Sequence, residues 1–182
     1  MTNVLEQFKL DEKVAIVTGG AMGLGKSMAT ALAQAGSHIV IADINIAVAE
    51  ETAEEIKKNE NVEAIGLKVD VTDPDAVNKM VEDVLEQFGK VDILVNNAGI
   101  TINAKAEEMS FEDWNKVINL NLNGIFLVAQ AVGRVMIKQG YGSIINTSSM
   151  SGLIANKPQE QSSYNASKAG VIMLTKSLAM EW

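Results

Sequence analysis

Cysteine is absent from this chain of 182 residues, and histidine and proline occur only once and twice. Without cysteine the chain has neither a disulfide nor a thiolate metal site, and a reducing compartment is compatible with it. The single histidine, His38, has no histidine partner and opens an apolar run, so we interpret it as structural and expect no metal site. With 47% apolar residues, the scarcity of proline indicates a compact, regular fold.

An excess of positive charge and a long hydrophobic run are also missing. The 15 basic residues are outnumbered by 23 acidic ones, and the formal net charge of −8 argues against nucleic acid and anionic membranes as partners. No apolar run approaches the ~18 residues of a membrane span. The start, MTNVLEQFKLDEK, is charged, unlike a secretory signal. We therefore expect a cytoplasmic protein in which residues 1–182 form one domain.

Strand and helix patterns alternate along the chain. The predicted strands are 14–17, 38–42, 62–69, 91–95 and 143–146, and the predicted helices are 27–35, 50–60 with a solvated face, 72–88, 110–139 and 162–181. Repeated strand–helix units predict an α/β fold with a doubly wound parallel sheet and helices on both faces. Ligands of such sheets bind at the carboxyl ends of the strands, where we expect the residues that follow each strand to meet.

A glycine-rich loop follows the first strand and fits two nucleotide-binding motifs. Residues 20–27, GAMGLGKS, match the pattern of P-loop nucleoside triphosphatases, in which Lys26 would reach phosphates and Ser27 would hold Mg²⁺. The same loop also fits a dinucleotide site, with glycines at 19, 23 and 25 that let backbone N–H groups approach a pyrophosphate.

The second strand favours the dinucleotide interpretation. It ends at Asp43, eighteen residues after Gly25, and an acidic residue at about this spacing binds the adenosine ribose hydroxyls. Asp43 would repel the 2′-phosphate of NADP, and no Lys or Arg lies near it in sequence. A triphosphatase also needs an acidic residue after a strand, a role that Asp43 or Asp92 could fill, so neither residue is diagnostic alone.

A second chemical device lies near the other end of the chain. Tyr164 and Lys168 are four residues apart in a predicted helix, which puts both side chains on one face. A tyrosine has an ordinary pKa near ~10, so working at neutral pH needs a shift of about three units, roughly 4 kcal/mol. A lysine ammonium beside the phenol favours that shift, and a serine such as Ser149 could hold a substrate oxygen against the tyrosine.

Six motifs in this order resemble the short-chain dehydrogenase/reductase family, from about Lys13 to the last residue. They are Thr18-Gly19-x-x-x-Gly23-x-Gly25, Asp70-Val71, Asn96-Asn97-Ala98-Gly99, Asn121 in Asn-Leu-Asn-Gly, Ser149, and Tyr164-x-x-x-Lys168. The resemblance implies a Rossmann-like fold and an NAD cofactor, with NADP disfavoured by Asp43. Family members continue for two further strands and a substrate-covering segment, so we expect the fold to be truncated after the helix that carries Tyr164 and Lys168.

The resemblance also implies a role for each motif residue. Tyr164 is the general acid/base, Lys168 lowers its pKa and binds the nicotinamide ribose, Ser149 bonds the reacting oxygen, and Asn121 holds a water of the proton relay. Besides Tyr164 and Lys168, the implied cofactor contacts are Gly19, Met22, Gly23, Leu24, Gly25, Asp43, Asp70, Val71, Asn97, Ala98 and Gly99.

The expected activity is NAD(H)-dependent interconversion of a secondary alcohol and a ketone. The polar segment 151–163, SGLIANKPQEQSS, precedes Tyr164 and resembles that of polyol and sugar dehydrogenases of the family. The alternatives are a 3-oxoacyl-carrier-protein reductase of the same family, a P-loop triphosphatase, and a catalytically silent NAD-sensing or scaffold protein. Family resemblance also implies a homo-oligomer, usually a tetramer.

Overall fold

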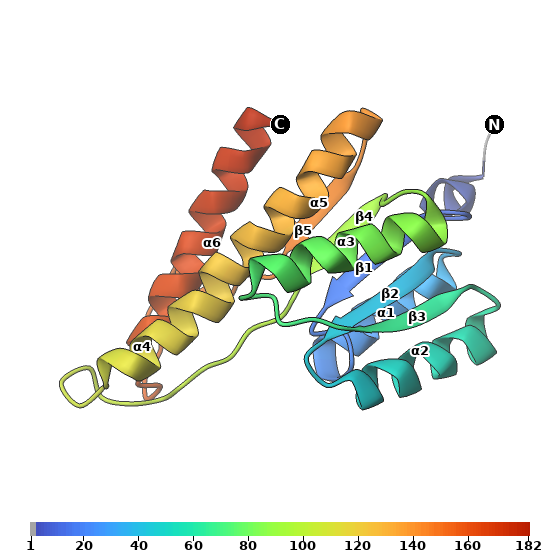
Figure 1. The fold of residues 1–182 in the computed structure, drawn as a ribbon. Helices are drawn as coiled ribbons and strands as arrows, with labels where there is room; N and C mark the ends of the chain where they lie inside the picture. Colours follow the sequence, from blue (N-terminus) through green and yellow to red (C-terminus); the bar gives the residue numbers. More distant parts are fainter. Residues whose placement is uncertain (1–2) are drawn as a thin grey trace.

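The computed structural model describes residues 3–182 and contains one parallel sheet of five strands in the order β3-β2-β1-β4-β5 (Figure 1). The strands are β1 Val14–Thr18, β2 His38–Asp43, β3 Ala64–Lys68, β4 Ile93–Asn96 and β5 Ser143–Asn146. The order reverses at β1, which has β2 and β4 as neighbours. The predicted doubly wound α/β fold is therefore confirmed.

Six α-helices connect and flank the strands (Figure 1). They are α1 Gly23–Gln34, α2 Ile46–Glu60, α3 Pro74–Phe88, α4 Phe111–Ile118, α5 Ile125–Gln139 and α6 Ser162–Glu181. Short 3₁₀ turns cover Val4–Phe8 and Met150–Gly152, and a π-helix covers Asn119–Gly124. Apolar residues of α1 and α2 bury one face of the sheet, and those of α3 and α5 bury the other.

The local sequence explains where most helices begin and end. The Asp73 carboxylate accepts hydrogen bonds from the backbone N–H groups of Asp75 and Ala76, and Pro74 occupies the first turn of α3, where its missing N–H costs nothing. Gly89 ends α3 in the left-handed conformation, with a φ of 75°. Ser110 caps α4 in the same way as Asp73 caps α3.

The structure shifts several of the predicted boundaries. Helix α1 begins at Gly23, inside the glycine loop, rather than at Ser27. Strand β4 begins at Ile93, and β3 is shorter than predicted at both ends. The segment predicted as one helix from 110 to 139 is interrupted by the π-helix, whereas α6 has the predicted bounds.

The helical stretch Phe111–Gln139 is long and apolar enough to cross a membrane by composition alone, and half of its most apolar window is buried inside the protein. Its apolar residues belong to the core, where Val128 and Val132 of α5 are fully buried against the sheet. This burial accounts for the apolar composition without a membrane.

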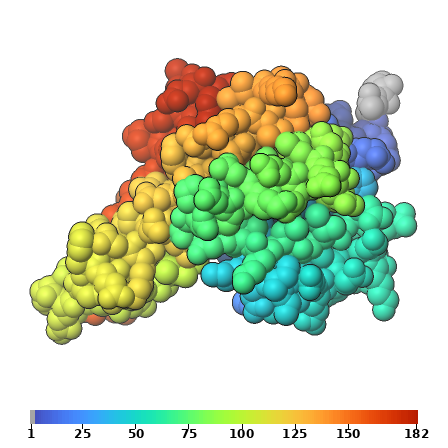
Figure 2. All heavy atoms as spheres, viewed as in Figure 1, coloured from blue at the N-terminus to red at the C-terminus, as the bar shows by residue number. Residues whose placement is uncertain are grey.

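The segment around residues 100–120 extends away from the sheet and leaves a hollow between itself and the body that holds β2 and α2 (Figure 2). The loops that follow the strands open towards this side of the molecule (Figure 1). The fold therefore places the carboxyl ends of the strands beside a concave surface, as expected for a ligand site.

Candidate active site

A cavity of about 1120 Å³ lies at the carboxyl ends of the strands. Its lining includes thirteen of the fifteen predicted site residues: Gly19, Met22, Leu24, Gly25, Asp43, Asp70, Val71, Asn97, Ala98, Gly99, Ser149, Tyr164 and Lys168. The two others, Gly23 and Asn121, do not line it. The volume lies slightly above that of ordinary ligand pockets, which measure about 300–1,000 Å³.

Two glycines of the loop after β1 are required by close packing. Gly19 has a φ of 60°, and a Cβ there would lie 2.9 Å from the Cα of Ala98. A Cβ on Gly25 would overlap the carbonyl oxygen of Gly19 and lie 2.7 Å from Asn97 Nδ2. The absence of side chains thus lets the loop, the first turn of α1 and the end of β4 meet, which leaves a cradle of exposed backbone for a phosphate.

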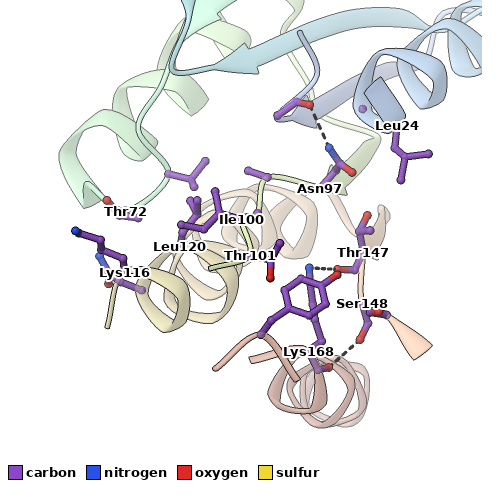
Figure 3. Close-up of a pocket in the computed structure, with 18 of the residues that line it drawn as sticks. Leu24, Thr72, Asn97, Ile100, Thr101, Lys116, Leu120, Thr147, Ser148 and Lys168 are labelled. Atoms are coloured by element: carbon purple, nitrogen blue, oxygen red, sulfur yellow. Dashed lines mark hydrogen bonds between the residues drawn. The ribbon is translucent and has the colours of Figure 1, made fainter. Parts of the chain in front are cut away.

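Thr18 and Asn97 hold this loop against the end of β4. The Thr18 Oγ1 accepts hydrogen bonds from the backbone N–H groups of Asn97 at 3.0 Å and of Ala98 at 3.2 Å. In return, Asn97 Nδ2 donates to the carbonyl oxygens of Thr18 and Gly19 at 3.2 and 3.1 Å (Figure 3). The site's glycine loop is therefore fixed from both sides before any ligand binds.

Asp43 ends β2 at the rim of the cavity. One carboxylate oxygen accepts a hydrogen bond from the Ala21 N–H at 3.2 Å, and the other accepts one from Asn45 N–H at 3.1 Å. These bonds fix the carboxylate beside the glycine loop, where the dinucleotide interpretation expects it. Further round the rim, the carboxylate of Asp70 accepts two hydrogen bonds from Thr72, and Val71 is buried beside it.

The geometry does not support the P-loop interpretation. A P-loop lysine points its ammonium at the nucleotide phosphates. Lys26 instead lies on α1 with its Nζ 2.6 Å from a carboxylate oxygen of Glu55 on α2, and it does not line the cavity. The Ser27 hydroxyl donates to the Gly23 carbonyl oxygen at 3.1 Å, within its own helix.

Lys168 is buried at the base of the cavity and is only 3% exposed. Its Nζ donates a hydrogen bond to the Thr147 carbonyl oxygen at 2.7 Å and lies 5.7 Å from the centre of the Tyr164 ring. The Ser148 hydroxyl in turn donates to the Lys168 carbonyl oxygen at 2.8 Å (Figure 3). Burial lowers the pKa of Lys168 below its ordinary value because it disfavours the charged form.

Ser149 begins the 3₁₀ turn Met150–Gly152 that follows β5. Its Oγ accepts a hydrogen bond from the Ser151 N–H at 3.1 Å, so the hydroxyl is held in place while its proton stays free to be donated. Ser149 and Tyr164 both line the cavity. The loop after β5 and the first turn of α6 thus contribute one hydroxyl each to the same space.

Asn121 lies in the π-helix and is fully buried. Its Oδ1 accepts from the Ile100 N–H at 2.8 Å, and its Nδ2 donates to the Ile100 carbonyl oxygen at 2.8 Å and to the Ser167 Oγ at 3.1 Å. The side chain therefore ties the loop after β4 to α6, one residue before Lys168. Its binding of a relay water stays a prediction.

Sequence reasoning assigned no role to Thr18, Thr147, Ser148 or Ser167, although each fixes a site residue through a hydrogen bond. Thr18 stands inside the glycine motif, and Ser167 immediately precedes Lys168, so position alone could have drawn attention to these two. Thr147 acts through its backbone carbonyl, and nothing in its side chain could have indicated this contact. No group of three or more potential metal ligands occurs within residues 3–182.

The glycine cradle, the rim carboxylate and the Tyr164–Lys168 pair match a known family. A model of the short chain dehydrogenase family covers residues 13–182. The chain belongs to this family. In this short-chain dehydrogenase, the glycine loop and the tyrosine–lysine pair both lie within the residues that the family model covers.

Curated relatives of this short-chain dehydrogenase differ in substrate and cofactor. It is 42% identical to the NADP-dependent mannitol dehydrogenase of Hypocrea jecorina, over 98% of this chain and 68% of the relative. It is 44% identical to a 3-oxoacyl-carrier-protein reductase of Thermotoga maritima, over 95% of this chain and 69% of the relative. The crystal structure of NAD⁺-bound xylitol dehydrogenase superposes with a TM-score of 0.90 at 36% identity, over 95% of this chain and 66% of that one.

The chain spans about two thirds of the length of the curated relatives it matches, between 65% and 69%. The residues covered by the family model, 13–182, contain the whole sheet described above and every residue of the candidate site.

Proposed function

We propose that the protein is an NAD(H)-dependent oxidoreductase that interconverts a secondary alcohol and a ketone. The observation that carries this proposal is that one cavity is lined by the glycine cradle and by Ser149, Tyr164 and Lys168. A bound nicotinamide cofactor would supply the hydride transfer. The protein's own residues would bind it and move the proton.

The proton step follows from the hydrogen bonds of the site. Ser149 has a free hydroxyl proton and can donate it to the substrate oxygen, which holds that oxygen in place. Tyr164 takes the alcohol proton during oxidation and returns it to the ketone oxygen during reduction. The Lys168 ammonium near the Tyr164 ring stabilises the negative charge that develops on the phenol oxygen when the proton leaves.

The cradle supports a dinucleotide as the cofactor, and Asp43 supports NAD rather than NADP. The Asp43 carboxylate lies at the rim of the cavity and can accept hydrogen bonds from two ribose hydroxyls. A 2′-phosphate at this position would face the same negative charge, and the next three residues, Ile44, Asn45 and Ile46, carry no positive charge to offset it. Because the relatives use both cofactors, Asp43 is the feature that favours NAD.

A polyol or sugar is the proposed substrate. The segment between β5 and α6 places polar side chains along the cavity: Ser151, Asn156, Gln159 and Gln161. Such a lining suits a ligand with several hydroxyl groups better than a long acyl chain. The mannitol and xylitol dehydrogenases among the relatives support the same class. We further propose a cytoplasmic homo-oligomer, by family resemblance.

Reduction of a 3-oxoacyl group is the second candidate, favoured by the 44% identity to the reductase of Thermotoga maritima. The two candidates differ in their preferred cofactor and substrate. NADPH-dependent reduction of an acetoacetyl thioester, without oxidation of xylitol or mannitol, would favour the reductase.

The test is a calorimetric titration of the protein with NADH, NADPH and Mg-ATP in parallel, followed by measurement of NADH formation from xylitol, mannitol and sorbitol. We expect tight binding of NADH, weak binding of NADPH, no binding of Mg-ATP, and NADH formation from at least one polyol. Asp43→Ala is the matched variant. It should reduce the difference between the NADH and NADPH affinities, because it removes the charge that opposes the 2′-phosphate.

Three results would contradict the proposal. Binding of Mg-ATP without binding of NADH or NADPH would support the triphosphatase interpretation. Binding of NADH without turnover of any alcohol would indicate an NAD-sensing or scaffold protein. Equal NADH and NADPH affinities in the unmodified protein would remove the role given to Asp43.

A further inference from the structure

Ser151 is a buried hydroxyl that borders the cavity two residues beyond Ser149, and it is only 7% exposed. Its Oγ accepts hydrogen bonds from Asn156 Nδ2 at 3.3 Å and from Gln161 Nε2 at 3.2 Å. A serine oxygen has two acceptor sites and one proton to donate. Since both acceptor sites are used, and no residue within 3–182 accepts the proton, the Ser151 hydroxyl is left as a donor to an occupant of the cavity.

Gln161 complements this donor. It is 8% exposed, lines the cavity, and donates both hydrogens of its amide nitrogen, one to Ser151 Oγ and one to Asn165 Oδ1 at 3.0 Å. Its carbonyl oxygen Oε1 accepts no hydrogen bond from the described part of the chain and is left as an acceptor. Ser151 and Gln161 therefore present one donor and one acceptor side by side.

A hydroxyl group is the ligand that matches this pair. It accepts a hydrogen bond and donates one at the same time, whereas a ketone or carboxylate oxygen can only accept, and an ammonium can only donate. A methyl or methylene group at this place would leave both buried groups without partners, at a cost in binding free energy.

The pair is tied to both residues that hold the reacting oxygen. The backbone N–H of Ser151 donates to Ser149 Oγ, so the two serines belong to one tight turn. Gln161 is bonded to Asn165, the residue that follows Tyr164 in α6. In the proposed binding mode, with the reacting oxygen between Ser149 and Tyr164, the next carbon of the substrate would lie towards Ser151 and Gln161.

We propose that Ser151 and Gln161 form a subsite for a hydroxyl on the carbon next to the reacting one. The protein then selects vicinal diols and α-hydroxy ketones over secondary alcohols that lack this neighbour. This inference rests on the proposed oxidoreductase function and narrows its substrate class. It makes both side chains specificity-determining residues that contact the substrate.

The test compares 2,3-butanediol with 2-butanol, which differ by one hydroxyl, using the stereoisomers of each and NAD as the cofactor. The measured quantity is the ratio of kcat/KM for the diol to that for the mono-alcohol. We expect a ratio of about 100 or more in the unmodified protein, because the mono-alcohol leaves a buried donor and acceptor unpaired. Ser151→Ala and Gln161→Met should each lower this ratio about tenfold.

Two further variants separate recognition from folding. Ser162→Ala makes the same change at an exposed serine in the same segment, outside the cavity, and should leave the ratio unaltered. Ser151→Thr keeps the hydroxyl and should restore most of the ratio that Ser151→Ala loses. NADH affinity, measured by fluorescence for every variant, reports whether the nucleotide site has folded.

The outcomes distinguish failure of the Ser151–Gln161 subsite from failure of the proposed oxidoreductase function. Oxidation of diol and mono-alcohol with equal kcat/KM would overturn the subsite and leave the oxidoreductase function standing. An equal loss of both activities in Ser151→Ala and Gln161→Met would assign the pair a merely structural role and also overturn the subsite. Absence of NADH formation from both alcohols and from xylitol, mannitol and sorbitol, despite NAD binding, would overturn the function and the subsite together.

Discussion

The cofactor-binding part of the molecule and the part that carries Tyr164 and Lys168 are held together by different forces. Strands β1 and β4 are buried along their whole length, and helices cover the sheet around them on both faces. Strand β5 alternates between exposed and half-buried residues, and Ile145 is 48% exposed. Apolar burial therefore dominates the first part and is much weaker in the second.

Side-chain hydrogen bonds hold β5 and α6 in place, where apolar burial is weaker. Asn96 Nδ2 on β4 donates to Asn146 Oδ1 on β5 at 2.9 Å, and Asn146 Nδ2 donates to Thr175 Oγ1 on α6 at 3.0 Å. Asn121 and Ser148 add bonds to α6 at Ser167 and Lys168. The difference indicates that packing holds the strands at the centre of the sheet, whereas the position of β5 and α6 depends more on directional polar contacts.

The largest effect that separates the two parts is expected from Tyr164→Phe. It removes the hydroxyl that we propose moves the proton and should lower kcat by about 1,000-fold or more, while the NADH affinity stays within about twofold. Steady-state kinetics and NADH titration check both values. Tyr141→Phe is the matched control, because Tyr141 lies outside this cavity, beside Lys13. Loss of NADH binding in a folded Tyr164→Phe protein would contradict the role given to the hydroxyl.

A pair of core truncations measures the difference in burial directly. Leu94 in β4 is fully buried, and Leu94→Ala should lower the free energy of unfolding by about 3 kcal/mol. Ile145→Ala in β5 should cost less than about 1 kcal/mol, because half of that side chain already faces solvent. Urea denaturation gives both values, and equal losses would show that β5 contributes as much apolar burial as β4.

Gly25→Ala tests the cradle. The added Cβ would overlap the Gly19 carbonyl oxygen, so the loop must shift, and NADH affinity should fall about 30-fold, or roughly 2 kcal/mol. Gly140→Ala controls for the general effect of replacing a glycine, since its φ is 80° but its Cβ would meet open space. An unchanged affinity in Gly25→Ala would mean that the cofactor does not depend on this close approach.

We expect acidification to lower the free energy of unfolding through Asp92, which is buried immediately before β4. Burial raises the pKa of this carboxyl, but the hydrogen bond from the Val14 N–H and the ammonium groups of Lys13 and Lys90 outweigh burial and hold the pKa below its ordinary 3.8. The unfolded chain therefore binds the proton first, and the stabilisation present above pH 3.8 is lost as pH falls through the folded-state pKa. Urea unfolding of Asp92→Asn beside the unmodified protein should show a stability difference that shrinks with acidification.

The smallest effect is expected from Lys168 on α6, through which a rise in pH should change the free energy of unfolding. Burial lowers its pKa below 10.5, so between the folded-state pKa and 10.5 the native protein has lost a proton that the unfolded chain still holds. The contribution of Lys168 to stability therefore rises with pH across that window. Compared with Lys168→Met in urea unfolding, the unmodified protein should gain stability as pH approaches 10.5. A constant difference would show that Lys168 titrates alike in both states.

The sequence was sufficient for the sheet and for most of the site. The apolar runs that begin at Val14 and His38 predicted β1 and β2, and the carboxyl-end rule placed Asp43 and Asn97 at one cavity. The π-helix could not be read from periodicity, because apolar spacing near 3.6 residues does not reveal one wider turn.

The contacts that fix the site residues could not be predicted from the sequence, for a different reason. Thr147 holds Lys168 through a carbonyl oxygen that every residue type possesses, and Asn146 meets Thr175 across 29 positions of chain. Local pattern carries no information about such pairs, since they depend on how the elements pack. Asn121 was predicted as a site residue, but its full burial and its bonds to Ile100 and Ser167 appear only in three dimensions.

The π-helix Asn119–Gly124 between α4 and α5 differs from a regular α-helical turn by about one residue, which is one codon of the gene. A π turn holds about one residue more than an α turn, so removal of one residue from Asn119–Gly124 would let a regular α-helix join α4 to α5 with the faces of both helices kept. As the chain stands, α4 packs against α6 while α5 packs against α3. In genetic terms, an in-frame deletion of one codon there would leave α4 and α5 with the same neighbours and alter only the wide turn that contains Asn121.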